Sequence, residues 1–102
     1  MTSAVYSLVR QAILEKKQVH AVFAGLPRRL CPHVIGAKNG RPQALFFQFG
    51  GSSRRGPLPA GDWRCLPIDQ LTDVSIHEGS WRTRRHTQPQ SCVDEVDLEV
   101  EL

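Results

Sequence analysis

The dipeptide Asn39-Gly40 stands between two stretches of strand-forming residues, and it constrains the fold more than any other feature of this sequence. Asn-Gly is the favoured composition of a two-residue hairpin turn, because both central residues of that turn take positive φ angles. We therefore expect antiparallel strands near residues 29–37 and 43–49 to pair across this turn. Pro32 in the first strand predicts an edge position or a bulge.

The rest of the chain predicts one helix and several short strands around this hairpin. Apolar residues recur at helical spacing over residues 4–17, whereas residues 19–23, 63–66 and 71–77 have the pattern of strands. One helix and about five strands in meander order indicate a mainly β (α+β) fold, a small, partly open barrel capped by the helix. The apolar stripe of the expected helix consists of Val5, Leu8, Val9, Ala12 and Ile13.

Length and cysteine content limit the class of protein. The 102 residues, 40% of them hydrophobic, suffice for one small domain with a single modest core. No apolar run approaches the roughly 18–20 residues that cross a bilayer, and the sequence shows no secretory signal. Cys31, Cys65 and Cys92 are odd in number and widely spaced, which favours reduced thiols in a cytoplasmic protein without a membrane partner.

Charge is distributed unevenly along the chain. All 13 Lys and Arg residues lie within residues 1–90 together with five acids, whereas residues 91–102 contain five acids and no base. A basic body predicts anionic partners, nucleic acid among them. We expect a domain over residues 1–80, a basic and polar linker over 81–91 and an acidic tail over 92–102.

The acidic tail has two interpretations. From Val96 to Leu102, apolar residues alternate strictly with acids. Such alternation suits an edge strand or a strand added to a partner, and it would then serve a protein partner or a homodimer. Without packing, the same residues would be a disordered end of the chain.

The segment after the second hairpin strand is the strongest candidate for a binding site. Gly50-Gly51 is followed by Ser52-Ser53 and then by Arg54-Arg55. Glycine and serine free backbone N–H groups for an anion-binding nest, and two guanidinium groups can grip a planar carboxylate or phosphate. An ordinary solvated turn is the alternative interpretation of this segment.

Metal and catalytic sites receive little support. The Cys and His residues show no paired ligand spacing, so we predict neither a metal nor a cofactor. His33, Ser53 and Asp69 supply a base, a nucleophile and an acid in principle, but no motif places them together. A hydrolase is therefore the weakest functional alternative, and we predict that the protein is not an enzyme.

Several of these residues together resemble the WYL domain, an SH3/Sm-like β-barrel module found mostly in bacterial transcription regulators. The resemblance covers about residues 5–78, and it is greatest with short, stand-alone WYL-like bacterial proteins. It implies a module that senses or binds an anionic ligand, either a nucleotide-like molecule or single-stranded nucleic acid. The resemblance is carried by Arg29, Pro32-His33, Gly36, Gly40, Leu45, Gln48, Gly50-Gly51, Ser53, Gly56, Trp63 and by the segment Cys65-Leu66-Pro67-Ile68-Asp69-Gln70-Leu71.

The sequence thus predicts a non-catalytic ligand-binding or regulatory module with a basic face. An interaction or oligomerisation module that uses the C-terminal strand is the alternative. The resemblance implies a binding role for Arg29, Gln48 and Ser53, and the basic strands and loop add the others. The predicted ligand-binding residues are Arg29, His33, Gln48, Ser53, Arg54, Arg55 and Arg64.

Overall fold

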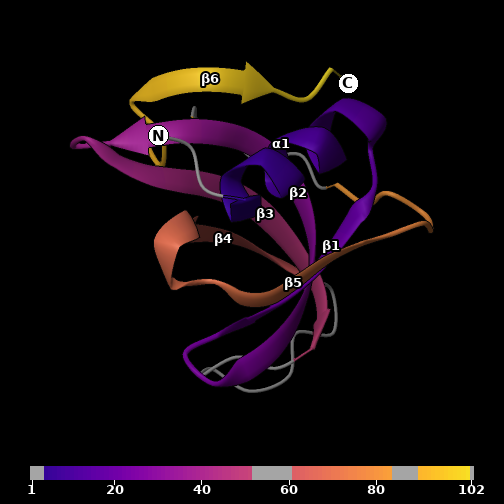
Figure 1. Ribbon diagram of the computed structural model, residues 1–102. Coiled ribbons are helices and arrows are strands. Elements are labelled where there is room, and N and C mark those ends of the chain that lie inside the picture. Colours follow the sequence, from indigo (N-terminus) through magenta and orange to yellow (C-terminus); the bar gives the residue numbers. More distant parts are fainter. Residues whose placement is uncertain (1–3, 52–60, 84–89, 102) are drawn as a thin grey trace.

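The computed structural model describes residues 4–51, 61–83 and 90–101. One α-helix, six strands and one 3₁₀ turn form in these ranges (Figure 1). No helix in the described ranges is both long and apolar enough to cross a membrane. In chain order the elements are α1 (Ala4–Glu15), β1 (Gln18–Phe23), β2 (Leu26–Lys38), β3 (Arg41–Gly51), β4 (Asp62–Pro67), η1 (Ile68–Gln70), β5 (Thr72–His77) and β6 (Glu95–Glu99).

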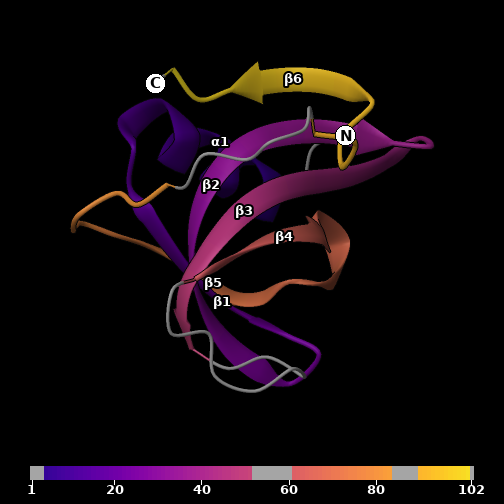
Figure 2. The same cartoon turned by 180° about the vertical axis from the view of Figure 1, so that it is seen from behind.

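All six strands belong to one antiparallel sheet, and the predicted mainly β, α+β class is confirmed. The strand order is β4-β3-β2-β1-β5, and β6 pairs with β2. The sheet is strongly bent but not closed, with α1 packed against β2 and β5 (Figures 1 and 2). The structure has one strand more than the five expected, because residues 95–99 join the sheet.

The hairpin around Asn39-Gly40 forms as predicted. Lys38 and Arg41 pair directly, and the two residues between them have φ angles of 51° and 77°. Asparagine and glycine tolerate these left-handed conformations better than other residues, which explains why the chain reverses here.

A bulge interrupts β2 next to Pro32, which is one of the two expectations for that residue. The pairing with β3 shifts between Pro32 and Val34, so His33 is the extra residue. On the other edge of β2, pairing with β1 ends at Leu30 and pairing with β6 begins at Val34. Pro32 has no N–H to donate, and it lies in the gap between these two neighbours, where no ladder bond is required.

Helix α1 buries Val9, Ala12 and Ile13 in the main core, as the apolar stripe predicts. The helix ends two residues before the expected boundary because Lys16 takes a left-handed φ of 51°. The Lys17 N–H then donates to the Ala12 carbonyl at 3.0 Å, and the Lys16 N–H donates to Ile13. These two bonds form a Schellman motif, which satisfies carbonyls at the helix end.

Both faces of the hairpin are covered, which explains why residues 44–48 are buried without alternation. Phe46 and Ala44 face the main core together with Leu30 and the helix. On the opposite face, Leu45 joins a second apolar cluster that also contains Val34, Cys92 and Val93, with Trp63 packed against it. The segment before β6 therefore covers the part of the second face around Val34 and Leu45.

The expectation that the cysteines are reduced is wrong for two of the three. Cys65 on β4 and Cys92 before β6 form a disulfide across a sequence separation of 27 residues, while Cys31 is free and buried. Spacing along the sequence could not reveal this pair, because the sheet brings β4 and the C-terminal segment together from distant positions. The disulfide ties that segment covalently to strand β4.

The C-terminal acidic segment forms strand β6, the first of its two interpretations. Figure 2 shows β6 lying along β2 on the side away from β3. Asp97 receives hydrogen bonds from the Tyr6 hydroxyl at 2.8 Å and from Arg10 Nε at 3.1 Å, both on α1. Burial, followed by the bond to Asp97, raises the pKa of Tyr6 to about 12, so the phenol remains a donor at neutral pH.

Candidate functional site

A row of polar side chains crosses three strands on the face of the sheet opposite the main core. Arg29 on β2 pairs with His20 on β1, and His20 pairs with Ser75 on β5. Directly opposite residues of antiparallel strands project to the same face, so these three side chains are neighbours. The row is accessible, because Arg29 and Ser75 are exposed and His20 is half-buried.

Two histidines stack within this row. The rings of His20 and His77 lie 3.8 Å apart between centroids, and His77 Nε2 is 2.8 Å from the Ser75 hydroxyl. Burial lowers the pKa of His20 from its ordinary value of 6.5, and the positive charges of His77 and Arg29 lower it further. His20 is therefore predominantly neutral at pH 7, and an anion bound beside it would favour its protonated form.

A pocket of about 330 Å³ opens beside this row. Arg29 and His20 line it, together with Arg28 and a single acid, Asp73. Gly51 also lines the pocket and is the last described residue before residues 52–60. The chain thus enters the predicted Gly/Ser/Arg segment at the rim of this pocket, although Ser53, Arg54 and Arg55 themselves lie outside the described residues. We refer to this cavity as the Arg29 pocket.

Gln48, a predicted ligand contact, is fully buried beneath this end of the sheet. Its Oε1 accepts a hydrogen bond from Arg28 Nη1 at 3.3 Å, and its Nε2 donates to the Gly50 carbonyl at 3.1 Å. The Arg28 guanidinium also lies 5.1 Å above the centroid of the Phe23 ring. Gln48 thus fixes the buried side chain of Arg28, and it does not present its amide to solvent.

His33 lies elsewhere, in the bulge of β2 and between two tryptophans. Its ring centroid is 4.6 Å from that of Trp63 and 4.3 Å from that of Trp81. Nδ1 is 2.8 Å from the Cys31 carbonyl and Nε2 is 2.8 Å from the Thr83 hydroxyl. With both ring nitrogens engaged, His33 fastens residues 81–83 to β2, and the arrangement gives no support to a role as general base.

Arg64 is also separated from the Arg29 pocket. It pairs with Phe46 and so faces the main core, whereas Arg29 projects from the opposite face. Only 14% of its side chain is exposed, and Nη1 lies 3.5 Å from the Asp62 carboxylate. Among the described residues predicted to bind a ligand, only Arg29 therefore lines this surface pocket. Sequence reasoning missed His20, Ser75 and His77, whose convergence depends on strand register.

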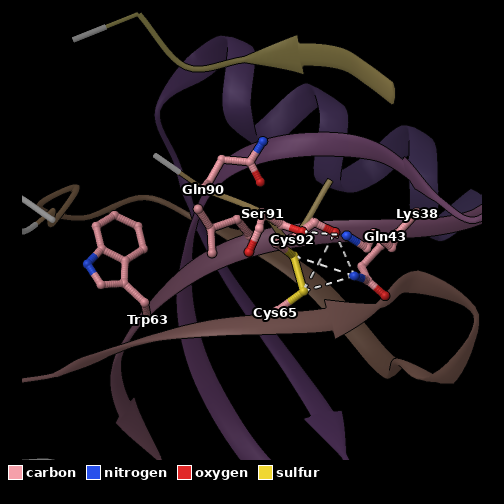
Figure 3. Close-up of a pocket in the computed structure, with 8 residues that line it drawn as sticks. Lys38, Gln43, Trp63, Cys65, Gln90, Ser91 and Cys92 are labelled. Carbon is pink, nitrogen blue, oxygen red and sulfur yellow. Dashed lines mark hydrogen bonds between the residues drawn. A yellow bond between two sulfur atoms is a disulfide. The ribbon is translucent and has the colours of Figure 1, made fainter. Parts of the chain in front are cut away.

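A second cavity lies beside the disulfide, nearer the Asn39-Gly40 end of the hairpin (Figure 3). It encloses about 460 Å³. Gln43 Nε2 donates to the Cys92 carbonyl at 2.7 Å and approaches Cys65 Sγ at 2.9 Å. Lys38 Nζ donates to the Ser91 carbonyl at 2.9 Å and lies 3.1 Å from Asp94. The cavity, here called the disulfide cleft, is lined by Lys38, Gln43, Leu45, Trp63, Cys65, Gln90, Ser91 and Cys92.

Comparisons with protein-family models, with curated proteins and with solved structures give no match to this chain. The resemblance to the WYL domain therefore stays a prediction from the sequence. A function must be inferred from the two cavities and from the residues that line them.

The titration of His20 gives a first testable consequence. Because its pKa is lowered in the folded chain, the unfolded chain binds more protons between that pKa and 6.5. The stabilising contribution of neutral His20 is thus present above pH 6.5 and is lost as the pH falls toward the lowered value. We expect His20→Asn to flatten this part of the stability profile, measured by urea unfolding between pH 7.5 and 5. Retention of the full slope in His20→Asn would contradict this origin, and Arg41→Gln serves as a distant control.

Proposed function

We propose that this chain is a non-catalytic binding or regulatory module whose Arg29 pocket takes an anionic ligand, either a nucleotide-like molecule or single-stranded nucleic acid. The observation that carries the proposal is the register that places exposed Arg29 next to His20 and Ser75, at the point where residues 52–60 begin. Forked guanidinium donors beside hydroxyl and imidazole groups suit phosphate or carboxylate oxygens.

The surroundings of Arg29 support an anion more than a neutral ligand. Arg28, His20 and Arg29 line the pocket against one acid, Asp73. The Arg28 guanidinium is bonded to buried Gln48 and Arg28 is only 5% exposed, so Arg29 carries the exposed guanidinium of this pocket.

The same proposal includes the assignment of the fold to the SH3/Sm-like barrels. A bent, open antiparallel sheet with one packed helix is compatible with the SH3/Sm-like barrel that the WYL resemblance implies. A regulatory role in the bacterial cytoplasm follows from that resemblance, in which the module senses a ligand on behalf of a transcription regulator.

The two alternative functions have less support. In the interaction hypothesis, the apolar and acidic C-terminal strand pairs with a partner, but here Glu95–Glu99 pairs with β2 of the same chain. The hydrolase hypothesis requires His33 to act as a base, and both of its ring nitrogens are within hydrogen-bonding distance of other groups of the chain.

The decisive test is the substitution Arg29→Ala. Losing one charge-assisted contact, worth about 1.5–3 kcal/mol, should weaken binding at low salt by about tenfold or more. The slope of log affinity against log salt should also fall by about one. Anisotropy titrations with labelled single-stranded DNA and RNA, competed with nucleotides, provide both quantities.

Arg41→Ala is the matched control for this test. Arg41 is an exposed arginine of the same hairpin, but it lies at the Asn39-Gly40 turn, at the end of β2 away from Arg29. Equal losses in the two variants would indicate nonspecific attraction to a basic body and would contradict an anion site at the Arg29 pocket. An absence of binding to nucleic acid and to nucleotides at low salt would reject the proposed ligand class.

A further inference from the structure

The disulfide cleft offers chemistry that the Arg29 pocket lacks, because one wall of the cleft is a disulfide. We propose that this cleft binds a small thiol bearing a carboxylate and that the thiol undergoes exchange with the Cys65–Cys92 bond. The site is separate from the proposed anion-binding site, since the two cavities share no lining residue. Figure 3 shows Trp63, Cys65 and Gln43 around the cleft.

The lining of the cleft suits a ligand of this size and charge. Its volume of about 460 Å³ falls within the range of about 300–1,000 Å³ typical of small-molecule sites. Trp63 and Leu45 supply an apolar wall, and Lys38 is the one charged residue among the described residues that line the cleft. The Lys38 ammonium donates to the Ser91 carbonyl and forms an ion pair with Asp94 at 3.1 Å, and its remaining donor can bind a carboxylate of the ligand.

The two sulfur atoms differ in accessibility, and this difference selects the point of attack. Cys65 is an exposed residue on β4, whereas Cys92 is 8% exposed and belongs to the second apolar cluster. An incoming thiolate therefore reaches Cys65 Sγ more readily than Cys92 Sγ. The rate of exchange depends on access and on the leaving thiol, so Cys65 should carry the ligand.

The exchange is balanced in two steps. The ligand thiol loses its proton to solvent, and its thiolate attacks Cys65 Sγ, so that a new S–S bond forms while Cys92 Sγ leaves as a thiolate. A second ligand thiolate then attacks the ligand sulfur of this mixed disulfide and releases Cys65 as a thiolate. Overall, two ligand thiols are oxidised to one ligand disulfide, and the two cysteines are reduced and take up protons.

The cleft also contains a group that can assist the leaving thiolate. Gln43 Nε2 donates to the Cys92 carbonyl and lies 2.9 Å from Cys65 Sγ and 3.7 Å from Cys92 Sγ. A hydrogen bond to a thiolate favours the charged form, so Gln43 can stabilise the thiolate released at either sulfur, and the difference in exposure decides which sulfur is attacked. Gln43 lies on β3, opposite Gly36 of β2, which fixes its position relative to the disulfide.

Exchange at this bond would change how the C-terminal strand is held. Cys92 lies three residues before β6, and the disulfide is the covalent bond between the β6 segment and β4. The ladder to β2 and the contacts of Asp97 with α1 do not depend on the bond. Reduction should therefore loosen β6 without unfolding the rest of the sheet. In a reducing compartment a disulfide of this kind is transient, as expected of an exchange site.

The test uses the oxidised full chain and reduced glutathione, a small thiol with two carboxylates. After brief exposure under native conditions and trapping with iodoacetamide, intact-mass and peptide mapping should find glutathione on Cys65 and the alkylated thiol on Cys92. Lys38→Gln should slow this reaction severalfold, whereas Arg41→Gln, which removes a neighbouring charge outside the cleft, should not. With cysteamine, a cationic thiol, Lys38→Gln should not slow the reaction.

Three results would overturn the proposal. The first is an adduct on Cys92 or Cys31 in place of Cys65. The second is a reaction no faster than global unfolding, measured in parallel by urea-dependent fluorescence. The third is an equal effect of Lys38→Gln on glutathione and cysteamine, which would remove the role of Lys38 in selecting an anionic thiol.

Discussion

Replacing both Cys65 and Cys92 with serine is expected to lower the free energy of unfolding by about 3.5 kcal/mol, the value for a crosslink spanning 27 residues in the chain-entropy model. Because the crosslink restricts mainly the unfolded chain, the double variant should keep the bent sheet under native conditions. Urea unfolding followed by tryptophan fluorescence measures the loss.

The wild-type chain under a strong reductant provides the matched comparison. Its stability should approach that of the double variant, and the double variant should not respond to the reductant. Amide exchange should become faster in residues 34–37 and 95–99, where β2 and β6 pair. Unchanged stability after loss of the disulfide would contradict a contribution of this crosslink to holding the C-terminal segment.

Gly36→Ala is expected to lower the free energy of unfolding by about 3 kcal/mol or more. A Cβ at this position would lie 1.9 Å from the Glu95 carbonyl oxygen and 2.7 Å from a methyl group of Val93. Because the first contact is with backbone, β6 must move away from β2. Urea unfolding gives the loss, and amide exchange should show that the opening is confined to β6 and its neighbours.

Gly50→Ala is the matched control, since it is the same change in the paired strand β3. A Cβ there would approach only the flexible side chain of Arg29, at 3.2 Å. Its effect should therefore be much smaller than that of Gly36→Ala. Equal losses in the two variants would show that the cost comes from glycine replacement in a strand and not from the close approach of β6.

The sequence predicts the local elements of this fold well, because local patterns determine them. The Asn39-Gly40 turn, the hairpin and the apolar stripe of α1 all follow from residues close together in the chain. The expected end of the helix was late by two residues, because a lysine with positive φ is not signalled by composition. For Pro32 the sequence predicted either an edge position or a bulge, and the structure contains the bulge.

Long-range relations could not be predicted from the sequence in the same way. The disulfide joins Cys65 to Cys92 through the arrangement of β4, β3 and the C-terminal segment, and an odd cysteine count pointed instead to reduced thiols. Alternation indicated a strand in the acidic tail, but it could not indicate β2 of the same chain as the neighbour. The register of the strands determines both the Cys65–Cys92 pairing and the neighbour of β6, and that register depends on the whole sheet.

In the candidate site, too, the residues indicated by local composition were predicted, whereas those brought together by strand pairing were not. Arginine content directed attention to Arg29, which lines a pocket, but not to His20, which lies beside it only after β1 and β2 have paired. Gln48 and His33 were expected at a surface and are buried, because both faces of the hairpin are covered. A polar residue in a strand signals a surface only when one face of that strand is open to solvent.

The dependence of β2 on two successive neighbours also has a consequence for protein synthesis. On the ribosome, β1, β2 and β3 can associate as soon as residue 51 is clear of the exit tunnel, but the edge of β2 at residues 34–37 has no partner until residues 95–99 have been translated. During that interval the nascent chain presents an open strand edge beside the apolar residues Val34 and Leu45. An open edge of this kind is a site for aggregation and a substrate for chaperones. Translation speed over the second half of the message should therefore affect the yield of native protein more than its final stability.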